Sequence, residues 1–298
     1  MVIEHLKFNT DTKMWPIIGY PMGHSSAAYA WNTFLVANNV NEIMWPVEIP
    51  VGGLPDFMSA VKTLGLRHFS LTMPHKAAII PLLDEVDPDS RFFNSVNLVK
   101  IDKDGKSHGM GFDGYGNLEA LRQANVNVRG MNILVLGAGS IVGVILQHLA
   151  RAGAEKATVI NRSYENAKTL VDKVKSSLDM KLEVLPFSKE NLDKAASECD
   201  LIEQCTPQGM FGYKGDWEYL GFIDKAKPET VVLETIVNPP ATTLVKKALQ
   251  RGLKVIFGID MMVGNKVEAF RFALGIEISP DQMAAAKKFM YRYFKLED

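Results

Sequence analysis

A short apolar run, Met131-Asn132-Ile133-Leu134-Val135-Leu136, is followed at once by Gly137-Ala138-Gly139-Ser140-Ile141-Val142-Gly143. The apolar run predicts a buried strand, and the apolar segment 144–152 predicts a helix. A strand, a glycine turn and a helix in this order form the phosphate-binding turn of dinucleotide folds, because glycines allow close backbone approach and the helix N-terminus attracts the pyrophosphate. The third glycine comes one residue later than in the common spacing. We therefore predict that these seven loop residues bind a dinucleotide.

The rest of the chain alternates short apolar runs with amphipathic stretches, which predicts strands alternating with helices around mostly parallel sheets. Before the glycine turn we expect strands at 15–20, 43–49 and 69–73, with helices at 27–37, 54–64 and 77–83. Residues 95–101 and 107–112 flank the turn Asp102-Lys103-Asp104-Gly105 and predict a hairpin at one edge of the sheet. A polar helix from 114 to 125 follows.

After the glycine turn, further strands are expected at 157–160, 182–187, 201–205, 230–234 and 254–257, and helices at 242–250, 261–273 and 280–294. A length of 298 residues favours two domains. We predict an α/β protein with a substrate domain, residues 1–118, and a Rossmann-like NAD(P)-binding domain, residues 119–275. The C-terminal helix, within residues 276–298, is expected to pack back on the first domain.

The composition argues against several classes of partner. Lys and Arg total 33 and Asp and Glu total 34, so neither nucleic acid nor an anionic membrane is expected to bind. No stretch approaches the roughly 20 apolar residues of a membrane span, and the charged N-terminus does not suit a signal peptide, so we expect a cytoplasmic protein. Cys199 and Cys205 lack a second pair and a nearby histidine, which supports neither a disulfide framework nor a metal site.

Lys76 is the candidate for chemistry in the first domain. Ser70-Leu71-Thr72-Met73-Pro74-His75-Lys76 reads as a strand end that turns into a helix, because Pro74 fixes φ where the chain must bend. Ligands bind at the carboxyl ends of parallel strands, so an amine at this place can serve a reaction. The alternative is a solvated lysine in the first turn of a helix. His75 is expected to point elsewhere, because adjacent helical residues do not share a face.

The choice of dinucleotide depends on the strand end at Asn161-Arg162-Ser163. An NAD site usually carries an acidic residue here for the ribose hydroxyls, whereas Arg162 suits an adenosine 2′-phosphate, so the sequence favours NADP over NAD. Glu165 lies nearby and leaves NAD open, and Arg162 can equally be an ordinary arginine at a helix start. The loop that begins Thr206-Pro207 leaves another strand end, where it either lines the nicotinamide side of the site or simply connects two elements.

Short motifs in a fixed order show that the chain, from Ile17 to Gly275, resembles the shikimate/quinate dehydrogenase family. These motifs are Ile18-Gly19-Tyr20-Pro21-Met22-Gly23-His24-Ser25, Leu71-Thr72-Met73-Pro74-His75-Lys76, Ser95-Val96-Asn97, Gly111-Phe112-Asp113-Gly114, the glycine turn, Asn161-Arg162-Ser163, Cys205-Thr206-Pro207-Gln208-Gly209-Met210 and Gly258-Ile259-Asp260-Met261-Met262-Val263-Gly264-Asn265. The resemblance implies reversible NAD(P)-dependent oxidation of a ring hydroxyl on a cyclic hydroxy acid, in a cleft between the two domains.

The resemblance also implies roles for single residues. Since the hydroxyl must lose a proton as hydride leaves, a base is required, and Lys76 takes that role with Asp113 beside it. By itself Asp113 can also be read as a turn residue before Gly114. The implied substrate-binding residues are Ser25, Ser70, Thr72, Asn97 and Asn265. The implied cofactor-binding residues, besides the glycine turn, are Asn161, Arg162, Ser163, Thr206, Pro207 and Gly258.

Departures from the family pattern gather on the substrate side. Ala27 replaces a second serine, Ser70 an asparagine, Leu98 a threonine, Val237 a tyrosine and Asn265 a glutamine. Each change removes or shortens a polar contact, at a cost of roughly 1–3 kcal/mol for each buried partner left unpaired. Two alternatives to shikimate or quinate oxidation therefore stand: the same chemistry on another small hydroxy acid, or a non-catalytic sensor of a dinucleotide or metabolite. We expect a monomer or a homodimer.

Overall fold

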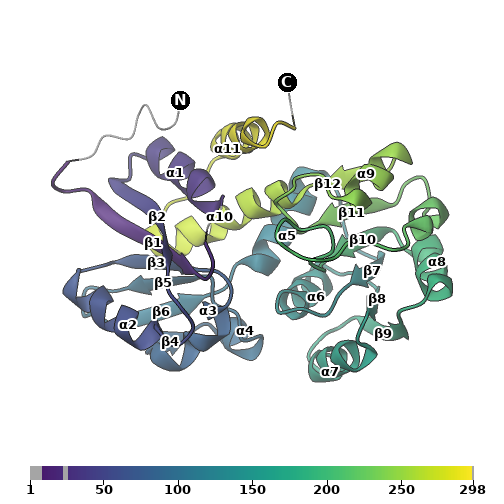
Figure 1. Ribbon diagram of the computed structural model, residues 1–298, viewed down its shortest axis with the longest axis horizontal. Coiled ribbons are helices and arrows are strands. Elements are labelled where there is room, and N and C mark those ends of the chain that lie inside the picture. Colours follow the sequence, from purple (N-terminus) through teal and green to yellow (C-terminus); the bar gives the residue numbers. More distant parts are fainter. Residues whose placement is uncertain (1–8, 23–25, 297–298) are drawn as a thin grey trace. The chain divides into compact units, whose positions relative to one another are not determined.

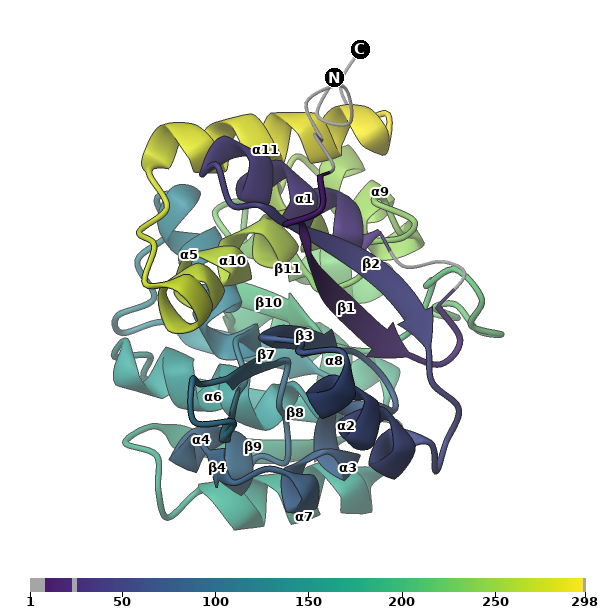
Figure 2. The same ribbon diagram turned by 90° about the vertical axis from the view of Figure 1, so that its left-hand side faces the viewer.

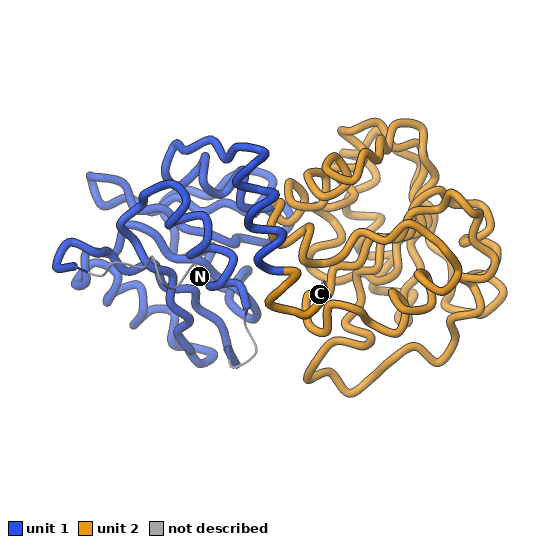
Figure 3. The backbone as a smooth tube through the Cα atoms, turned by 90° about the horizontal axis from the view of Figure 1, so that it is seen from above, with its two compact units in different colours: residues 1–112, 265–290 blue, residues 113–264, 291–298 orange. Residues whose placement is uncertain are grey.

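The computed structural model describes residues 9–22 and 26–296 (Figure 1). The chain divides into two compact units, Met1–Phe112 with Asn265–Met290, and Asp113–Gly264 with Tyr291–Asp298 (Figure 3). Each unit contains its own six-stranded sheet. This arrangement confirms the predicted α/β class with two parallel-rich sheets.

The sheet of the first unit has the order β2-β1-β3-β5-β6-β4. Its strands are β1 (Lys13–Gly19), β2 (Glu42–Glu48), β3 (His68–Leu71), β4 (Glu85–Val86), β5 (Leu98–Ile101) and β6 (Ser107–Met110). β1 pairs in parallel with β2 and with β3, and β4 pairs in parallel with β6, whereas β5 runs antiparallel to β3 and β6. Figure 2 shows β1 and β2 as two long neighbouring strands.

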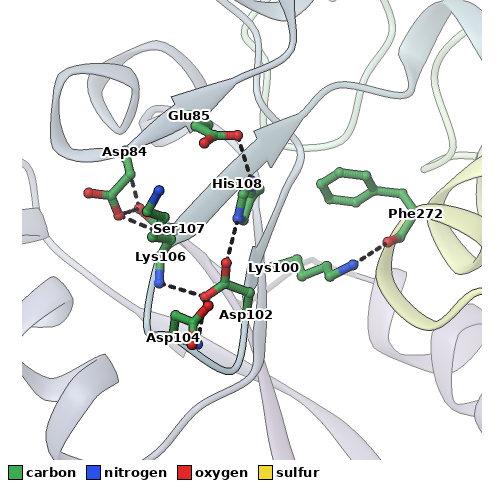
Figure 4. A network of polar contacts seen from close by, with 9 residues as sticks. All are labelled: Asp84, Glu85, Lys100, Asp102, Asp104, Lys106, Ser107, His108 and Phe272. Atoms are coloured by element: carbon green, nitrogen blue, oxygen red, sulfur yellow. Dashed lines mark hydrogen bonds and ion pairs between the residues drawn. The ribbon is translucent and has the colours of Figure 1, made fainter.

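The predicted hairpin is the pair β5 and β6 (Figure 4). The Asp102 carboxylate accepts hydrogen bonds from the backbone N–H groups of Asp104 (3.0 Å) and Lys106 (2.8 Å), which closes the turn. Its second oxygen contacts His108 Nε2 at 3.1 Å, while His108 Nδ1 contacts Glu85 at 3.1 Å. The predicted place at the sheet edge was wrong, because the two-residue strand β4 pairs outside β6.

Helices pack on both faces of this sheet. The helices of this unit are α1 (Ala27–Ala37), α2 (Leu54–Thr63), α3 (His75–Ala78), the 3₁₀-helix η2 (Ile80–Leu82), α4 (Pro88–Phe92), the second half of α10 (Gly258–Leu274) and α11 (Pro280–Tyr293). The single helix expected at 77–83 is two short pieces, because Pro81 has no N–H to continue an α-helix. The Gln282 amide in α11 donates to Asn38 Oδ1 at 2.9 Å, immediately after α1.

Alternation along the strands divides the core of the first unit into two layers. Phe69 and Leu71 join an apolar cluster with Phe57 of α2 and Ile79 after α3. On the other face, the Trp15 ring stacks on His68 with a centroid distance of 4.5 Å and lies 4.8 Å from the Trp31 ring of α1. A sheet covered on both faces leaves its strand ends as the places for polar chemistry.

The sheet of the second unit is parallel throughout, in the order β12-β11-β10-β7-β8-β9. Its strands are β7 (Asn132–Leu136), β8 (Lys156–Asn161), β9 (Lys181–Pro186), β10 (Leu201–Gln204), β11 (Val231–Glu234) and β12 (Lys254–Ile256). From β7 the chain first builds outward to β9 and then returns to add β10, β11 and β12 on the other side of β7. This strand order is that of the Rossmann fold, whose ligands bind where the order reverses.

The helices of the second unit are α5 (Asp113–Gln123), α6 (Val142–Arg151), α7 (Tyr164–Val174), α8 (Lys189–Glu198), the 3₁₀-helix η3 (Gly221–Lys225), α9 (Thr243–Gln250) and the first half of α10. Leu134, Ile202 and Val232 on the central strands pack with Leu192 of α8 and Leu244 of α9 in one buried cluster. Among the described helices, none is long and apolar enough to cross a membrane.

Candidate functional site

The lysine motif turns sharply at the carboxyl end of β3. Thr72 N–H donates to the Ile18 carbonyl at 2.9 Å, so the chain still follows β1 for one residue after β3 ends. His75 N–H then donates to the Thr72 carbonyl at 3.0 Å, and α3 begins. Gly19 permits this approach, because a Cβ there would lie 2.4 Å from Thr72 Cγ2. The predicted strand at 69–73 therefore ends at Leu71, and Lys76 is the second residue of the short helix.

Lys76 and His75 occupy different surroundings. Lys76 is half-buried, and its carbonyl accepts a hydrogen bond from Val96 N–H at 3.0 Å, which places it beside the segment that enters β5. His75 is buried, and its Nε2 contacts the Ile49 carbonyl at 2.7 Å. The imidazole thus serves the packing of the first unit.

Asn97 connects three segments of the first unit. Its carbonyl accepts from Leu71 N–H at 2.7 Å, and its N–H donates to the Met110 carbonyl at 3.0 Å. Its side-chain Oδ1 accepts from Phe112 N–H at 2.6 Å. This last bond fixes the backbone directly before Asp113, so one asparagine ties the end of β3 to the residue that precedes the candidate catalytic aspartate.

Asp113 is buried and is the first residue of α5. Gly114 follows it because a Cβ there would lie 2.2 Å from His148 Nδ1 of α6. Gly111, two residues before Asp113, has no room for a side chain either, since a Cβ would lie 2.3 Å from the Ser95 carbonyl oxygen. Neither the residue after Asp113 nor the residue two positions before it therefore has room for a side chain.

The other residues that the sequence predicted to bind substrate have very different contacts. Ser70 is buried, and its hydroxyl accepts a hydrogen bond from Trp15 Nε1 at 3.1 Å. Thr72 and Asn265 are half-buried, and Asn265 Oδ1 accepts from Lys266 Nζ at 2.5 Å. Ser25 lies outside the described residues.

Lys266 was missed in the sequence. It is 3% exposed, and its Nζ lies 5.0 Å from the centroid of the Trp31 ring. A single lysine within an apolar helical pattern gives no local sign of such burial, because the sequence does not show which ring will cover it.

In the glycine turn, the first two glycines are required for different structural reasons. Gly137 has φ +115°, and a Cβ there would lie 2.8 Å from the Cys205 carbonyl oxygen. Gly139 has open space, since a Cβ would meet no described atom within 4 Å. Ala138 and Ile141 are half-buried, Ser140 is exposed, and Val142 and Gly143 are buried in the first turn of α6.

The N-terminus of α6 suits an anion. Its N-cap residue, Ile141, makes no side-chain capping hydrogen bond, and its first turn carries no acidic residue. Free N–H groups at a helix start bind phosphate oxygens. The open space at Gly139 and the uncapped α6 therefore fit the pyrophosphate of a dinucleotide.

The strand end after β8 presents an exposed arginine. Asn161 donates from its side chain to the Ser163 carbonyl at 2.8 Å, and Ser163 caps α7 by accepting from Asn166 N–H at 3.4 Å. Arg162 between them is exposed and forms no ion pair with any residue that the structure describes. Its guanidinium is therefore available to an anionic ligand.

Buried polar residues organise the loop after β10. The side-chain oxygen of Gln204 accepts from both the N–H and the hydroxyl of Thr206 at 2.8 Å, and its amide donates to the Thr206 carbonyl at 2.9 Å. These contacts hold the chain just before Pro207. Gly258 opens α10, where a Cβ would lie 2.2 Å from the Ile236 carbonyl oxygen.

Glu234, at the end of β11, is the carboxylate of this network. It accepts from Ile236 N–H at 2.9 Å and from the Thr242 hydroxyl at 2.7 Å, and burial raises its pKa to about 7. Gln204 and Glu234 were read in the sequence only as strand residues. The polarity of these two residues, each at the end of an apolar run, was the feature of the sequence that could have identified them as site residues.

A parallel sheet in Rossmann order, a glycine turn with open space and an uncapped helix define a dinucleotide-binding α/β protein. Family models match two stretches: the shikimate dehydrogenase substrate-binding domain matches residues 17–99, and shikimate/quinate 5-dehydrogenase matches residues 119–210. The chain belongs to the shikimate/quinate dehydrogenase family, which confirms the resemblance drawn from the motifs.

Known relatives cover nearly the whole chain. Shikimate dehydrogenase (NADP(+)) of Symbiobacterium thermophilum is 31% identical over 91% of this chain and 92% of its own length. Shikimate 5-dehydrogenase from Listeria monocytogenes, solved with shikimate and NAD, has a TM-score of 0.84 and 25% identity over 95% of this chain and 98% of that one. The Thermus thermophilus enzyme, solved with NADP(H) and shikimate, has a TM-score of 0.79 and 25% identity over 93% and 99%.

Proposed function

We propose that this protein is an NAD(P)-dependent dehydrogenase that oxidises a ring hydroxyl of shikimate, quinate or a related cyclic hydroxy acid. Family membership supports the reaction class. The observation that carries the proposal is the hydrogen bond from Phe112 N–H to Asn97 Oδ1, at 2.6 Å. It links the asparagine beside the lysine-bearing turn to the backbone that leads directly into Asp113.

In this proposal Lys76 removes the proton of the reacting hydroxyl and returns it in the reverse direction. Asp113 orients the lysine amine and the hydroxyl, and Asn97 binds the substrate ring with its amide. Ser25, Thr72 and Asn265 are the further substrate-binding residues of the proposal. The bound nicotinamide supplies the chemistry of hydride transfer.

We also propose that the first unit is the substrate-binding domain and the second the dinucleotide-binding domain. Residues 137–143 would hold the pyrophosphate, since their backbone approaches closely and α6 is uncapped. Asn161, Arg162 and Ser163 would bind the adenosine side, and Thr206, Pro207 and Gly258 the nicotinamide side. Given the near-zero net charge, −1, we propose a cytoplasmic monomer or homodimer without nucleic acid or membrane partners.

A matrix of NAD and NADP against shikimate, quinate and simpler hydroxy acids tests the function directly. Reduction of the nicotinamide is followed by its absorbance. We expect turnover with at least one cyclic hydroxy acid. A purified, folded protein that oxidises none of these acids with either dinucleotide would contradict the proposal and favour the non-catalytic sensor.

One set of contacts favours a substrate other than shikimate as the second candidate. The Ser70 hydroxyl bonds to Trp15, Asn265 Oδ1 bonds to Lys266, and Leu98 is fully buried. Two substrate-side oxygens are therefore engaged within the protein itself. The second candidate is excluded if shikimate has the highest kcat/KM in the matrix.

Arg162 is expected to set the preference for NADP. Arg162→Ala should raise the KM for NADP by about 10- to 100-fold, since a charge-assisted hydrogen bond contributes about 1.5–3 kcal/mol. The KM for NAD should stay within about twofold, because NAD lacks the 2′-phosphate. Arg251→Ala, at another exposed arginine of the second unit, is the control. Equal changes for both dinucleotides would contradict the role.

A further inference from the structure

A carboxyl group lies in the middle of the second sheet. Glu203 is fully buried in the central strand β10, where its register neighbours are Val135 of β7 and Leu233 of β11. No cation contributes to its pKa among the described residues. A buried carboxylate without a positive partner is strongly disfavoured, so such a group either finds hydrogen-bond donors or keeps its proton.

The partner of Glu203 is an equally buried amide. Asn117 of α5 is fully buried, and its Nδ2 donates to Glu203 Oε2 at 3.0 Å. Glu203 Oε1 and Asn117 Oδ1, the other oxygens of the same two groups, are buried without a hydrogen-bond partner among the described residues. Buried polar atoms are nearly always paired, and a protonated carboxyl is a donor. One proton on Oε1 would satisfy both orphaned oxygens.

We propose that Glu203 is a positioning residue for the dehydrogenase reaction: as a neutral acid it forms a ring of two hydrogen bonds with Asn117 and thereby holds the start of α5. The inference rests on the proposed function, in which Asp113 orients the reacting groups. Asn117 follows Asp113 by four residues, so both lie on the same side of α5. The strand β10 then fixes the orientation of the helix turn that carries Asp113.

Two glycines give close packing around the start of α5, beside the T-shaped contact of the Tyr115 and His148 rings, whose centroids lie 4.5 Å apart. Gly114 packs against the His148 ring, and Gly264 approaches the Gly116 carbonyl, where a Cβ would lie 2.9 Å from the oxygen. The glycine contacts set the distance between helices without fixing rotation about the helix axis. A pair of hydrogen bonds with defined directions adds a constraint on that rotation.

The protonation state agrees with the geometry. Burial raises the pKa of Glu203 to about 8, while the Asn117 hydrogen bond lowers it by less. Other ionisable groups on the surrounding elements include Asp113, Tyr115 and Glu119 in α5, His148 in α6, Glu234 in β11, Asp260 in α10, and Cys205 directly after β10, whose own pKa is raised by burial, by Glu203 and by Glu234. Near pH 7 the acid therefore carries the proton that the ring needs.

Ionisation of Glu203 should therefore loosen α5 at alkaline pH. The pKa of Glu203 is higher in the folded chain than its ordinary value of 4.5, so between about pH 4.5 and 8 the folded chain holds the additional proton. Stability must then fall as pH rises through this window. Glu203→Gln removes this linkage, because its amide donates to Asn117 Oδ1 at every pH.

The test compares wild type, Glu203→Gln and Glu203→Leu, with Glu218→Gln as an exposed control. Relative to Glu203→Gln, the equilibrium constant for folding of wild type should fall by up to about tenfold for each pH unit between about pH 4.5 and 8. The kcat of wild type should fall above about pH 8 relative to Glu203→Gln, whereas Glu203→Leu should lower kcat by about 10- to 100-fold near neutrality. The infrared absorption of protonated carboxyl groups should lose the contribution of Glu203 in Glu203→Gln, which leaves that of Glu234, and should be unchanged in the control.

If wild type and Glu203→Gln have identical pH profiles of unfolding and identical infrared spectra, the proposed ring of two hydrogen bonds is refuted. Wild-type kcat in a folded Glu203→Leu would overturn the positioning role. If that variant does not fold, the double variant Asn117→Leu/Glu203→Met replaces the pair by apolar groups of similar size and is read in the same way. Complete absence of turnover in wild type would instead refute the proposed function and the positioning role with it. The pH dependence of unfolding and the infrared band would still show whether Glu203 and Asn117 form the ring of two hydrogen bonds.

Discussion

Lys76→Ala is expected to lower kcat for hydroxy-acid oxidation by about 10²- to 10⁴-fold, the usual contribution of a positioned acid–base group. The amine lies on a short helix directly after the carboxyl end of β3, and its backbone is held by the Val96 N–H. Removal of the amine leaves the hydroxyl proton without an acceptor while the glycine turn is untouched. The Kd of NADP should therefore change by less than about twofold, which calorimetry can measure.

Lys103→Ala is the matched control, since Lys103 is an exposed lysine on the hairpin of the same unit. It should retain wild-type kcat. Thermal unfolding of both variants excludes misfolding as the cause of lost turnover. A Lys76→Ala protein with wild-type kcat would refute the assigned role. A rise in the Kd of NADP as large as the fall in kcat would show that the lysine acts in binding.

The second large effect is expected at Gly139. A Cβ there meets no described atom within 4 Å and φ does not lie in the left-handed region, so Gly139→Ala should fold with an unchanged melting temperature. The new methyl group would occupy the space in which we propose that the pyrophosphate binds. Overpacking costs about 1–3 kcal/mol, so the Kd of NADP should rise by about 10- to 100-fold.

Gly137→Ala provides the contrast, because a Cβ there would lie 2.8 Å from the Cys205 carbonyl oxygen and φ is +115°. That variant should lose thermal stability as well as affinity. Unchanged NADP affinity in Gly139→Ala would show that the open space does not belong to the cofactor.

Local pattern was sufficient for most of the fold. The run 131–136 and the glycines after it predicted β7 and α6, and the chain length favoured two domains. The prediction of secondary structure was wrong where one or two residues determine the local structure. Pro81 divides the helix expected at 77–83, and the two-residue strand β4 is too short to show a periodicity.

The candidate site was predictable only where its residues lie in motifs. Lys76, Asn97 and Asp113 each stand in a short recognisable run. The pair Asn117 and Glu203 does not, because 86 residues separate its members and each looks like an ordinary polar residue locally. The same applies to Lys266 and Trp31, whose contact depends on the packing of α10 against α1.

The several bonds of Asn97 limit how mutational data at this position can be interpreted. Its backbone holds β3 and the end of β6, while its Oδ1 holds Phe112. Alanine at this position would change folding and ligand affinity together, so a single affinity value would be ambiguous. Aspartate keeps the acceptor toward Phe112 and replaces the amide donor with a second, negatively charged acceptor, so a comparison of the aspartate and alanine variants separates the architectural role of residue 97 from molecular recognition.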